Sequence, residues 1–184
     1  MSTGVKPPIL IVDDEPDVLF SLKALLRHDF ELYTAESGDE ALTILSQHPV
    51  HVIMTDQRMP GMTGVELMNH ARAQYPATVR IVFTGYADIK AVVQAINSGG
   101  LFRYITKPWD PDDLIETLHL AAKRYEEKSA RAQFAADVKA FVSDAMTLIQ
   151  STVGSEFADD VASLIGRAER ISIQADTLPQ EPTG

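Results

Sequence analysis

The sequence of 184 residues contains no cysteine, no long apolar run and no excess of positive charge. Without cysteine there are no disulfide bonds and no thiolate metal sites, which suits a reducing cytoplasm. No stretch of about eighteen apolar residues is present, so we expect no membrane span. Residues 1–8 (MSTGVKPP) lack the apolar segment of a signal peptide, so we expect a cytoplasmic protein.

Charge and composition narrow the class of protein further. The chain carries 16 basic and 26 acidic side chains, a net charge of −10. Duplex nucleic acid is then a poor partner, because binding phosphates requires clustered lysine and arginine. Hydrophobic residues make up 45% of the chain, which is enough for a sizeable core. The length predicts one domain, or one domain with an appendage.

Short apolar segments alternate with helical patterns along the first two thirds of the chain. The expected strands are residues 8–12, 30–35, 50–54, 79–83 and 101–105, and a helical pattern follows each of them. Continuous apolar runs of this length are typical of strands buried on both faces. Because each strand is joined to the next by a helix, we expect an α/β fold with a five-stranded, doubly wound parallel sheet.

Helix starts carry recognisable capping residues. Ser37 with Glu40, and Thr63 with Glu66, have the spacing of capping boxes. Asp110 precedes a proline, so it is expected to cap the last helix of the sheet domain.

The last third of the sequence is helical without a sheet pattern. No glycine or proline occurs between residues 112 and 153, and residues 126–131 are nearly all polar, which suggests that a core-facing stripe ends there. Two later apolar stripes share a 4-3-4-3 spacing: Phe134, Val138, Phe141, Ala145 and Leu148, then Phe157, Val161, Leu164, Ala168 and Ile171. We expect a helical hairpin that turns near Gly154. The predicted division is a sheet domain at 1–122, a helical extension at 123–176 and a disordered tail at 177–184.

Polar side chains stand at the ends of four predicted strands. Asp13 and Asp14 follow the first strand, Asp56 the third, Thr84 the fourth and Lys107 the fifth. In a parallel sheet these ends meet at one edge, where ligands bind. Each residue alone has a common structural role, as a turn former, a helix cap or a solvated charge. The convergence of all five side chains at one edge favours a binding or catalytic site there.

This set of side chains indicates a particular chemistry. Three neighbouring carboxylates repel one another unless a cation lies among them. Oxygen ligands without sulfur favour Mg²⁺. A carboxylate beside Mg²⁺ can attack phosphorus, while the metal and Lys107 neutralise the transferring group and Thr84 donates a hydrogen bond to it.

Four segments, IVDDEP, MTDQRMPGMTGVEL, IVFTGY and YITKPW, resemble the receiver domain of bacterial two-component response regulators, in order and spacing, over roughly residues 7–122. The stretch from TDQRMPG to YITKPW is most similar to receivers of the hydrogenase-regulator type. The resemblance implies a flavodoxin-like fold, and it implies that Asp56 accepts a phosphoryl group from the phosphohistidine of a histidine kinase in a phosphorelay.

The same resemblance assigns roles to further residues. It implies that Asp14 and Asp56 bind Mg²⁺ directly, that Asp13 acts through water, and that the backbone carbonyl of Arg58 completes the metal site. Thr84 and Lys107 would contact the phosphoryl group, and Tyr104 would be the aromatic residue that switches with Thr84. The peptide bond from Lys107 to Pro108 is often cis in relatives.

Two bulky residues are expected to set the lifetime of the phosphorylated state. Arg58 stands two residues after the phosphoacceptor and Tyr86 two residues after the threonine. We predict that they shield the acylphosphate from water and slow its self-hydrolysis. The alternative, with both side chains turned to solvent, stays open.

The output of such a switch is expected to be a protein contact. No nucleotide-binding motif is present, and all five histidines precede the extension, so it is not a histidine phosphotransfer module. We expect the extension to form a homodimeric four-helix bundle or to dock a downstream protein, with packing on its own receiver as the alternative. We expect neither an enzyme nor a partner of nucleic acid or membrane. The alternatives are a Mg²⁺-dependent phosphatase or phosphotransferase and a transcription regulator with an atypical output.

Overall fold

A computed structural model describes residues 5–85, 101–152, 162–163 and 166–167. The elements in chain order are β1 (Pro8–Val12), α1 (Pro16–Leu26), β2 (Glu31–Ala35), α2 (Gly38–Gln47), β3 (Val52–Asp56), α3 (Gly64–Gln74), β4 (Val79–Thr84), β5 (Arg103–Thr106) and α5 (Pro111–Thr152). The helix expected after Tyr86, the turn expected near Gly154 and the tail lie outside the described residues.

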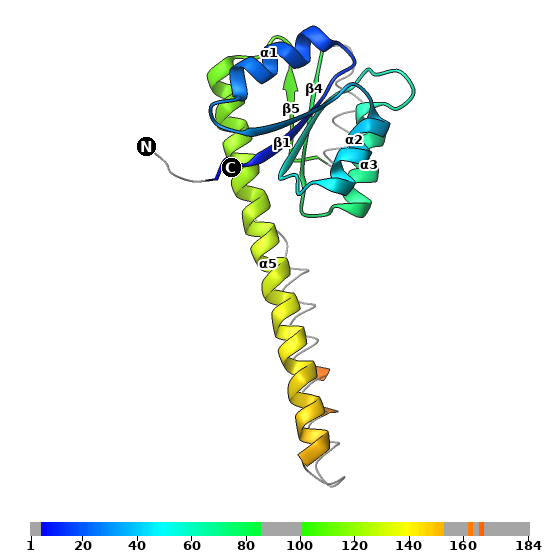
Figure 1. The fold of residues 1–184 in the computed structure, drawn as a ribbon, viewed down its shortest axis with the longest axis vertical. Coiled ribbons are helices and arrows are strands. Elements are labelled where there is room, and N and C mark those ends of the chain that lie inside the picture. The colour runs from blue at the N-terminus through cyan, green and yellow to red at the C-terminus, as the bar shows by residue number, and fades with distance from the viewer. Residues whose placement is uncertain (1–4, 86–100, 153–161, 164–165, 168–184) are drawn as a thin grey trace. The chain divides into compact units, whose positions relative to one another are not determined.

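The five strands form one parallel sheet in the order β2-β1-β3-β4-β5 (Figure 1). The predicted α/β fold with a five-stranded parallel sheet is confirmed. The register pairs Asp56 with Phe83 and Thr84 with Thr106, so the last residues of these strands lie along one edge. The third strand starts and ends two residues later than expected, which makes Asp56 its last member.

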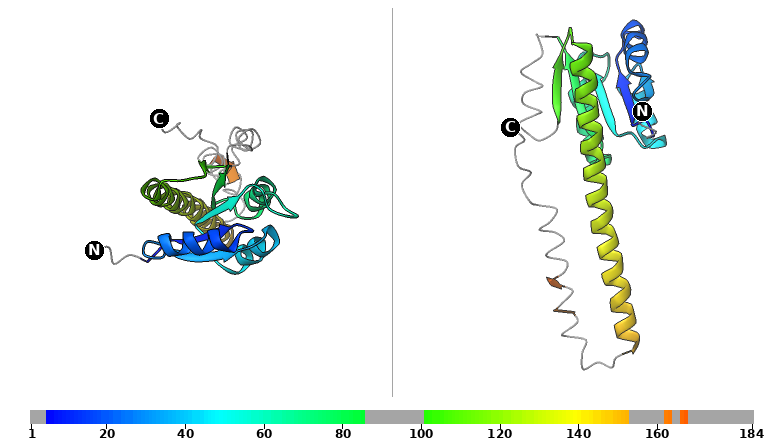
Figure 2. Two further views of the ribbon diagram at one scale, coloured as in Figure 1. Left: turned by 90° about the horizontal axis from the view of Figure 1, so that it is seen from above. Right: turned by 90° about the vertical axis from the view of Figure 1, so that its left-hand side faces the viewer.

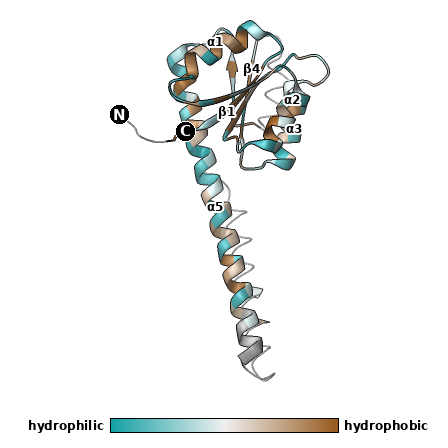
Figure 3. Ribbon diagram, in the orientation of Figure 1, coloured by the Kyte–Doolittle hydropathy of each residue, from teal (hydrophilic) through white to brown (hydrophobic). Residues whose placement is uncertain are grey.

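Burial follows the position of each strand in the sheet. Every residue of β1, β3 and β4 is buried, whereas the edge strands β2 and β5 are partly exposed. Alternate residues of the central strands face opposite layers: Ile9 and Ile11 pack with α1 and α5, and Leu10 and Val12 pack with α2 and α3. Figure 2 shows helices on both sides of the sheet, and Figure 3 shows its apolar strands.

The capping predictions are confirmed in two cases out of three. Thr63 and Glu66 form the complete box, in which each side chain accepts a hydrogen bond from the other residue's backbone N–H. Asp110 accepts from the N–H groups of the second and third residues of α5. The box at Ser37 is only half formed, because the Glu40 carboxylate accepts from the N–H of Glu36 instead. All three caps fix where helices start relative to the sheet.

Helix α5 is a single 42-residue helix that continues through the polar segment 126–131. The compact sheet unit reaches Lys128, beyond the boundary expected after residue 122. The unit extends this far because two residues of α5 contact the rest of it. The Tyr125 ring stacks on His51 at 4.0 Å between centroids, and Lys128 Nζ donates to the carbonyl of Pro76 at 3.5 Å. Residues 129–184 form a second unit. Within the described residues, no helix is long and apolar enough to cross a membrane.

Candidate functional site

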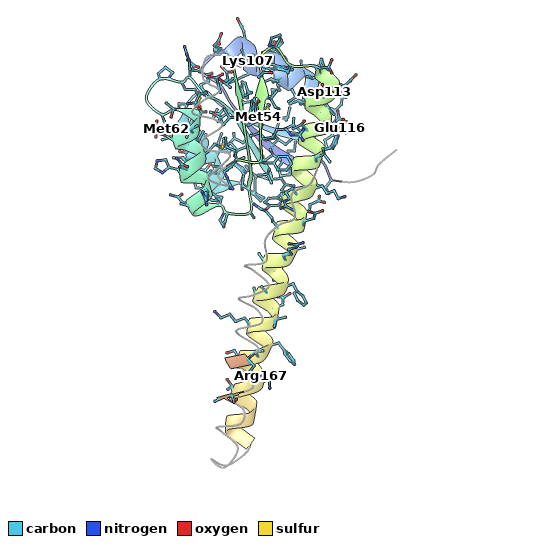
Figure 4. The ribbon with its side chains drawn as sticks, turned by 180° about the vertical axis from the view of Figure 1, so that it is seen from behind. Met54, Met62, Lys107, Asp113, Glu116 and Arg167 are labelled. Atoms are coloured by element: carbon cyan, nitrogen blue, oxygen red, sulfur yellow. The ribbon has the colours of Figure 1, made fainter. Side chains whose placement is uncertain are left out.

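The site lies where the order of strands changes direction. From β1 the chain first adds β2 on one side and then β3 on the other, which leaves a crevice at the carboxyl ends of β1 and β3. Asp13 directly follows β1, and Asp56 ends β3. Lys107, which follows β5, lies at this same edge of the sheet, whereas Met54 lies in the middle of β3 (Figure 4).

The Lys107 ammonium joins the two carboxylates. Its Nζ atom lies 2.7 Å from Asp56 Oδ1 and 3.1 Å from Asp13 Oδ2. The predicted convergence of Asp13, Asp56 and Lys107 is therefore present. Two carboxylates and one ammonium leave one negative charge within the cluster, and the neighbouring Asp14, which is half-buried, adds another.

Asp13 is fully buried at the centre of this cluster. Burial raises the pKa of its carboxyl, and the negative charge of Asp56 adds to the rise; hydrogen bonds from the Glu15 N–H and from Lys107 oppose it. The Glu15 N–H donates to Asp13 Oδ1 at 2.8 Å. Burial is the main cause of this rise, because it disfavours the charged form of the carboxyl.

Asp56 is 8% exposed, so it is largely buried but not fully closed off from solvent. Its Oδ2 atom accepts the N–H of Arg58 at 2.5 Å, while Oδ1 binds Lys107. Both oxygens are therefore held by a donor. This fixes the orientation of the carboxylate before any reaction, as an attacking nucleophile requires.

Lys107 is held by its backbone as well as by its side chain. Its N–H donates to the carbonyl of Thr84 at 2.9 Å, and its Nζ lies 4.7 Å from the centre of the Phe83 ring on β4. Burial alone would lower the pKa of the ammonium, but hydrogen bonds to Asp56 and Asp13 outweigh it and the pKa is raised. The group remains charged. The following peptide bond to Pro108 is cis, as the resemblance suggested.

Thr84 and Tyr104, the expected switch residues, lie on the adjacent strands β4 and β5. Thr84 is 1% exposed, and its hydroxyl donates to the Gly85 carbonyl at 3.2 Å. Tyr104 is 36% exposed. Its side chain lines a cavity of about 400 Å³ between β5 and the start of α5, with Trp109 and Asp113 also on its wall. Tyr86, expected to shield the phosphoryl group, lies outside the described residues.

Two residues that shape the site were not singled out from the sequence. The buried Gln57 accepts the N–H of Val65 at 3.1 Å through its side chain, and its carbonyl accepts the N–H of Gly64. A Cβ at Gly64 would lie 2.3 Å from the Asp56 carbonyl. The start of α3 thus approaches the end of β3 so closely that only glycine fits. The glycine one residue after Thr63, the predicted helix cap, was the available signal.

The donor set fits a magnesium ion in its chemistry. Asp13, Asp14, Asp56 and the Arg58 carbonyl offer only oxygen, which Mg²⁺ prefers, and the cluster has an excess of negative charge. Within the described part of the chain, no three acidic or histidine side chains are already arranged around a common metal position. Lys107 instead takes the place between Asp13 and Asp56.

Comparison with known proteins places these features in context. A family described as "Response regulator receiver domain" matches residues 9–119. The hydrogenase transcriptional regulatory protein HoxA of Cupriavidus necator is 44% identical over 115 residues, which cover 62% of this chain and 24% of that protein. A receiver domain protein from Clostridium thermocellum has a crystal structure with a TM-score of 0.62 at 31% identity, covering 65% of this chain and 97% of that one.

One relative aligns with nearly the whole chain. The DNA-binding transcriptional regulator NtrC of Klebsiella pneumoniae is 29% identical over 177 residues, which cover 95% of this chain and 35% of that protein. The chain thus spans about a quarter to a third of the length of these two curated relatives. Both names describe regulators of transcription, so the expectation of no nucleic-acid partner is not supported.

Proposed function

The chain belongs to the response regulator receiver domain family, and on that premise we propose that it is a phosphorylation switch with Asp56 as the phosphoacceptor. The observation that carries the proposal is the Lys107 ammonium held between Asp56 and Asp13. A histidine kinase, or a phosphotransfer protein, is the proposed phosphodonor.

The proposed reaction is a direct displacement at phosphorus. A carboxylate oxygen of Asp56 forms a bond to phosphorus, the P–N bond of the donor phosphohistidine breaks, and the imidazole nitrogen keeps the electron pair and takes up a proton. Lys107 is already hydrogen-bonded to Asp56, so its charge stands beside the oxygens of the arriving group. Thr84, at the end of β4, would donate its hydroxyl to the phosphoryl group.

Magnesium is the proposed cofactor. Asp14, Asp56 and the Arg58 carbonyl would hold the ion directly, and Asp13 would hold it through water. When bound, the ion supplies positive charge that stabilises phosphoryl transfer. The pKa of the buried Asp13 carboxyl is raised chiefly by its burial, and a nearby cation would favour the charged form of that group.

The proposed output is a change in protein contacts near Tyr104. Phosphorylation adds roughly −1.5 to −2 charges at Asp56. Full switching between two states requires about 5.5 kcal/mol of differential stabilisation. Tyr104 and Trp109 line the cavity beside β5 and the start of α5, only a few residues from Lys107, so this surface is where a partner would detect the change.

The second unit is proposed to pair with a second copy of the chain. Its helix is long, and Phe134 and Phe141 on it are largely exposed. Two amphipathic helices bury little apolar area alone, whereas two hairpins make a four-helix bundle.

A second candidate function is control of transcription. It is favoured by the 44% identity to HoxA and by the alignment with NtrC over 95% of this chain. Salt-dependent, sequence-selective binding of the chain to DNA fragments would support direct control. Catalytic turnover is not proposed, because Arg58 stands two residues after Asp56, where an aspartate-dependent phosphatase has a second acid. Repeated release of phosphate from a small phosphoester would instead indicate a phosphatase.

The test of the main proposal is phosphorylation by a small donor. Incubation with acetyl phosphate and Mg²⁺ is expected to add one phosphoryl group, detected by intact-mass spectrometry. Asp56→Asn should stay unmodified, whereas Asp144→Asn, an exposed aspartate of α5, should react like the natural sequence. A wild-type chain that stays unmodified, or an Asp56→Asn variant that reacts equally, would overturn the proposal.

A further inference from the structure

Gln57 connects the end of β3 to the start of α3. The first four backbone N–H groups of an α-helix have no partner within the helix, so they need acceptors from elsewhere. In α3 all four have one. Thr63 and Glu66 bond two of them through their capping box. The Gln57 carbonyl accepts the N–H of Gly64, and the Gln57 side-chain oxygen accepts the N–H of Val65, both at 3.1 Å. One residue outside the helix thus supplies half of these hydrogen bonds.

The peptide unit that follows Gln57 is bonded at both of its ends. It consists of the Gln57 carbonyl and the Arg58 N–H, which lie in one plane because the peptide bond is rigid. The carbonyl is bonded to the start of α3, and the N–H donates to Asp56 Oδ2. The orientation of this plane, and with it the hydrogen bond that holds the Asp56 carboxylate, therefore depends on how the chain after β3 is tied to α3.

The Gln57 side chain adds a second tie between the same two segments. The residue is 8% exposed, and its side-chain hydrogen bond joins residues that are eight positions apart in the chain. The junction is tightly packed, since Gly64 approaches the Asp56 carbonyl so closely that no side chain fits between them. A side chain that cannot accept this hydrogen bond would leave the N–H of Val65 without its partner, which is costly away from water.

We propose that Gln57 is a positioning residue for the magnesium site. The inference rests on the magnesium site of the proposed function and goes beyond it by naming a residue that acts through Arg58. The Arg58 carbonyl, the proposed backbone ligand, belongs to the residue directly after Gln57. The role assigned to Gln57 is to hold the backbone that carries this carbonyl, not to contact the ion or the phosphoryl group. Removal of such supporting hydrogen bonds typically weakens metal binding by roughly 10- to 100-fold.

The first test measures Mg²⁺ binding without any phosphodonor. Gln57→Met keeps the length of the side chain and removes its hydrogen bond, so Mg²⁺ is expected to bind about tenfold more weakly. The rise in melting temperature with Mg²⁺ concentration gives the affinity, because a ligand that binds only the folded state stabilises it by mass action. Gln57→Glu retains an accepting oxygen and should bind Mg²⁺ at least as tightly as the wild type. Gln74→Met, at the exposed end of α3, is the matched control and should leave the affinity unchanged.

A variant of the other helix cap separates positioning from stability. Thr63→Ala removes the side-chain acceptor of the Glu66 N–H and is expected to lower the melting temperature, as Gln57→Met does. It leaves both hydrogen bonds of Gln57 in place, so the affinity for Mg²⁺ should stay close to that of the wild type. Equal losses of affinity in Thr63→Ala and Gln57→Met would overturn the proposal, because the effect would then come from the stability of α3 alone.

The rate of phosphorylation by acetyl phosphate provides an independent readout. In Gln57→Met the Mg²⁺ concentration that gives half the maximal rate should rise by the same factor of about ten, whereas the maximal rate should be largely kept. A lower maximal rate with an unchanged half-saturating concentration would contradict the positioning role. If Gln57→Met does not fold, Gln57→Asn, whose side chain is one carbon shorter, is expected to show the same loss.

The outcomes distinguish this inference from the proposed function. Wild-type affinity for Mg²⁺ in Gln57→Met, with phosphorylation of Asp56 intact, overturns the role of Gln57 and leaves the switch. A wild-type chain that is not phosphorylated, but in which Gln57→Met weakens Mg²⁺ binding, overturns the switch and supports the role of Gln57. A wild-type melting temperature that does not respond to Mg²⁺ overturns the proposed cofactor and this inference together.

Discussion

Lys107 reaches across β4 to place its ammonium 2.7 Å from the Asp56 carboxylate. The two residues lie at the ends of strands that are not neighbours, so only the folded sheet brings them together. The same ammonium also binds Asp13. One positive charge is thus shared by two carboxylates.

Removal of the Lys107 ammonium should destabilise the fold, because two buried or nearly buried carboxylates then lack their positively charged partner. Lys107→Met is expected to lower the free energy of unfolding by about 1–3 kcal/mol, because Asp13 and Asp56 lose their shared partner. Urea unfolding measured without Mg²⁺ checks this. Lys139→Met, which removes an exposed lysine from α5, is the control and should change little. Equal stability of the two variants would contradict the account of the cluster.

Asp13 should weaken the metal-free fold as pH rises. The pKa of its carboxyl is raised by burial above the ordinary value of 3.8, so its favourable contribution is present below that value and is lost as pH rises through the folded pKa. Asp13→Asn is expected to remove this part of the pH dependence and to reduce the stabilisation that Mg²⁺ gives. Thermal unfolding across the acidic range, with and without Mg²⁺, measures both. If the Asp13→Asn variant has the same dependence of melting temperature on pH as the wild type, this prediction is wrong.

His51 should have the opposite dependence on pH. Burial lowers the pKa of its imidazole, with the charge of Glu126 opposing, and the ring stacks on Tyr125. The folded state therefore favours the neutral ring, so stability falls as pH drops below the ordinary histidine value of 6.5. His51→Phe keeps an aromatic ring and should flatten the melting temperature between about pH 7 and pH 5.5. His70→Phe, at an exposed position, should retain the wild-type slope.

Gly64 should be intolerant of any side chain. A Cβ there would lie 2.3 Å from the Asp56 carbonyl, which is backbone and cannot move without displacing Asp56 itself. Gly64→Ala is expected to cost about 1–3 kcal/mol of stability and to slow phosphorylation by acetyl phosphate. Gly85→Ala is the matched control, because a Cβ at Gly85 would meet no atom of the described residues within 4 Å. If both alanine variants react at the wild-type rate, α3 does not position Asp56.

The sequence was sufficient to predict the sheet and the meeting of Asp13, Asp56 and Lys107. Alternating strands and helices dictate a parallel sheet, and a parallel sheet gathers its strand ends at one edge. The sequence could not show that the Lys107 ammonium would lie between the two acids. That contact depends on the side-chain conformation at the end of β5 and on the fixed orientation of Asp56.

Helix α5 shows what polarity alone cannot predict. The polar residues 126–131 end an apolar stripe, yet the helix continues, because no glycine or proline interrupts its backbone hydrogen bonds. Contacts of Tyr125 and Lys128 with the sheet unit then extend that unit to Lys128. The spacing of apolar residues predicted the stripe of Phe134 and Val138 but not which of them would be covered.

The lifetime of the phosphorylated state provides another measurable expectation. Arg58 is exposed beside Asp56 and donates its backbone N–H to that carboxylate. We expect Arg58→Ala with Tyr86→Ala to hydrolyse the acylphosphate faster than wild type, because less bulk shields it from water. Phosphate release after removal of the donor measures this. Hydrolysis no faster in the double variant would contradict the shielding role.

Transfer of one phosphoryl group to Asp56 in the presence of Mg²⁺ tests the central claim most directly. Acetyl phosphate with Mg²⁺ is expected to modify the chain once, with the label located by peptide mass spectrometry at Asp56, and chelation of Mg²⁺ should abolish the reaction. A chain that remains unmodified, or that carries the label on another residue, would contradict the assignment of the Asp13, Asp56 and Lys107 cluster as a phosphoacceptor site.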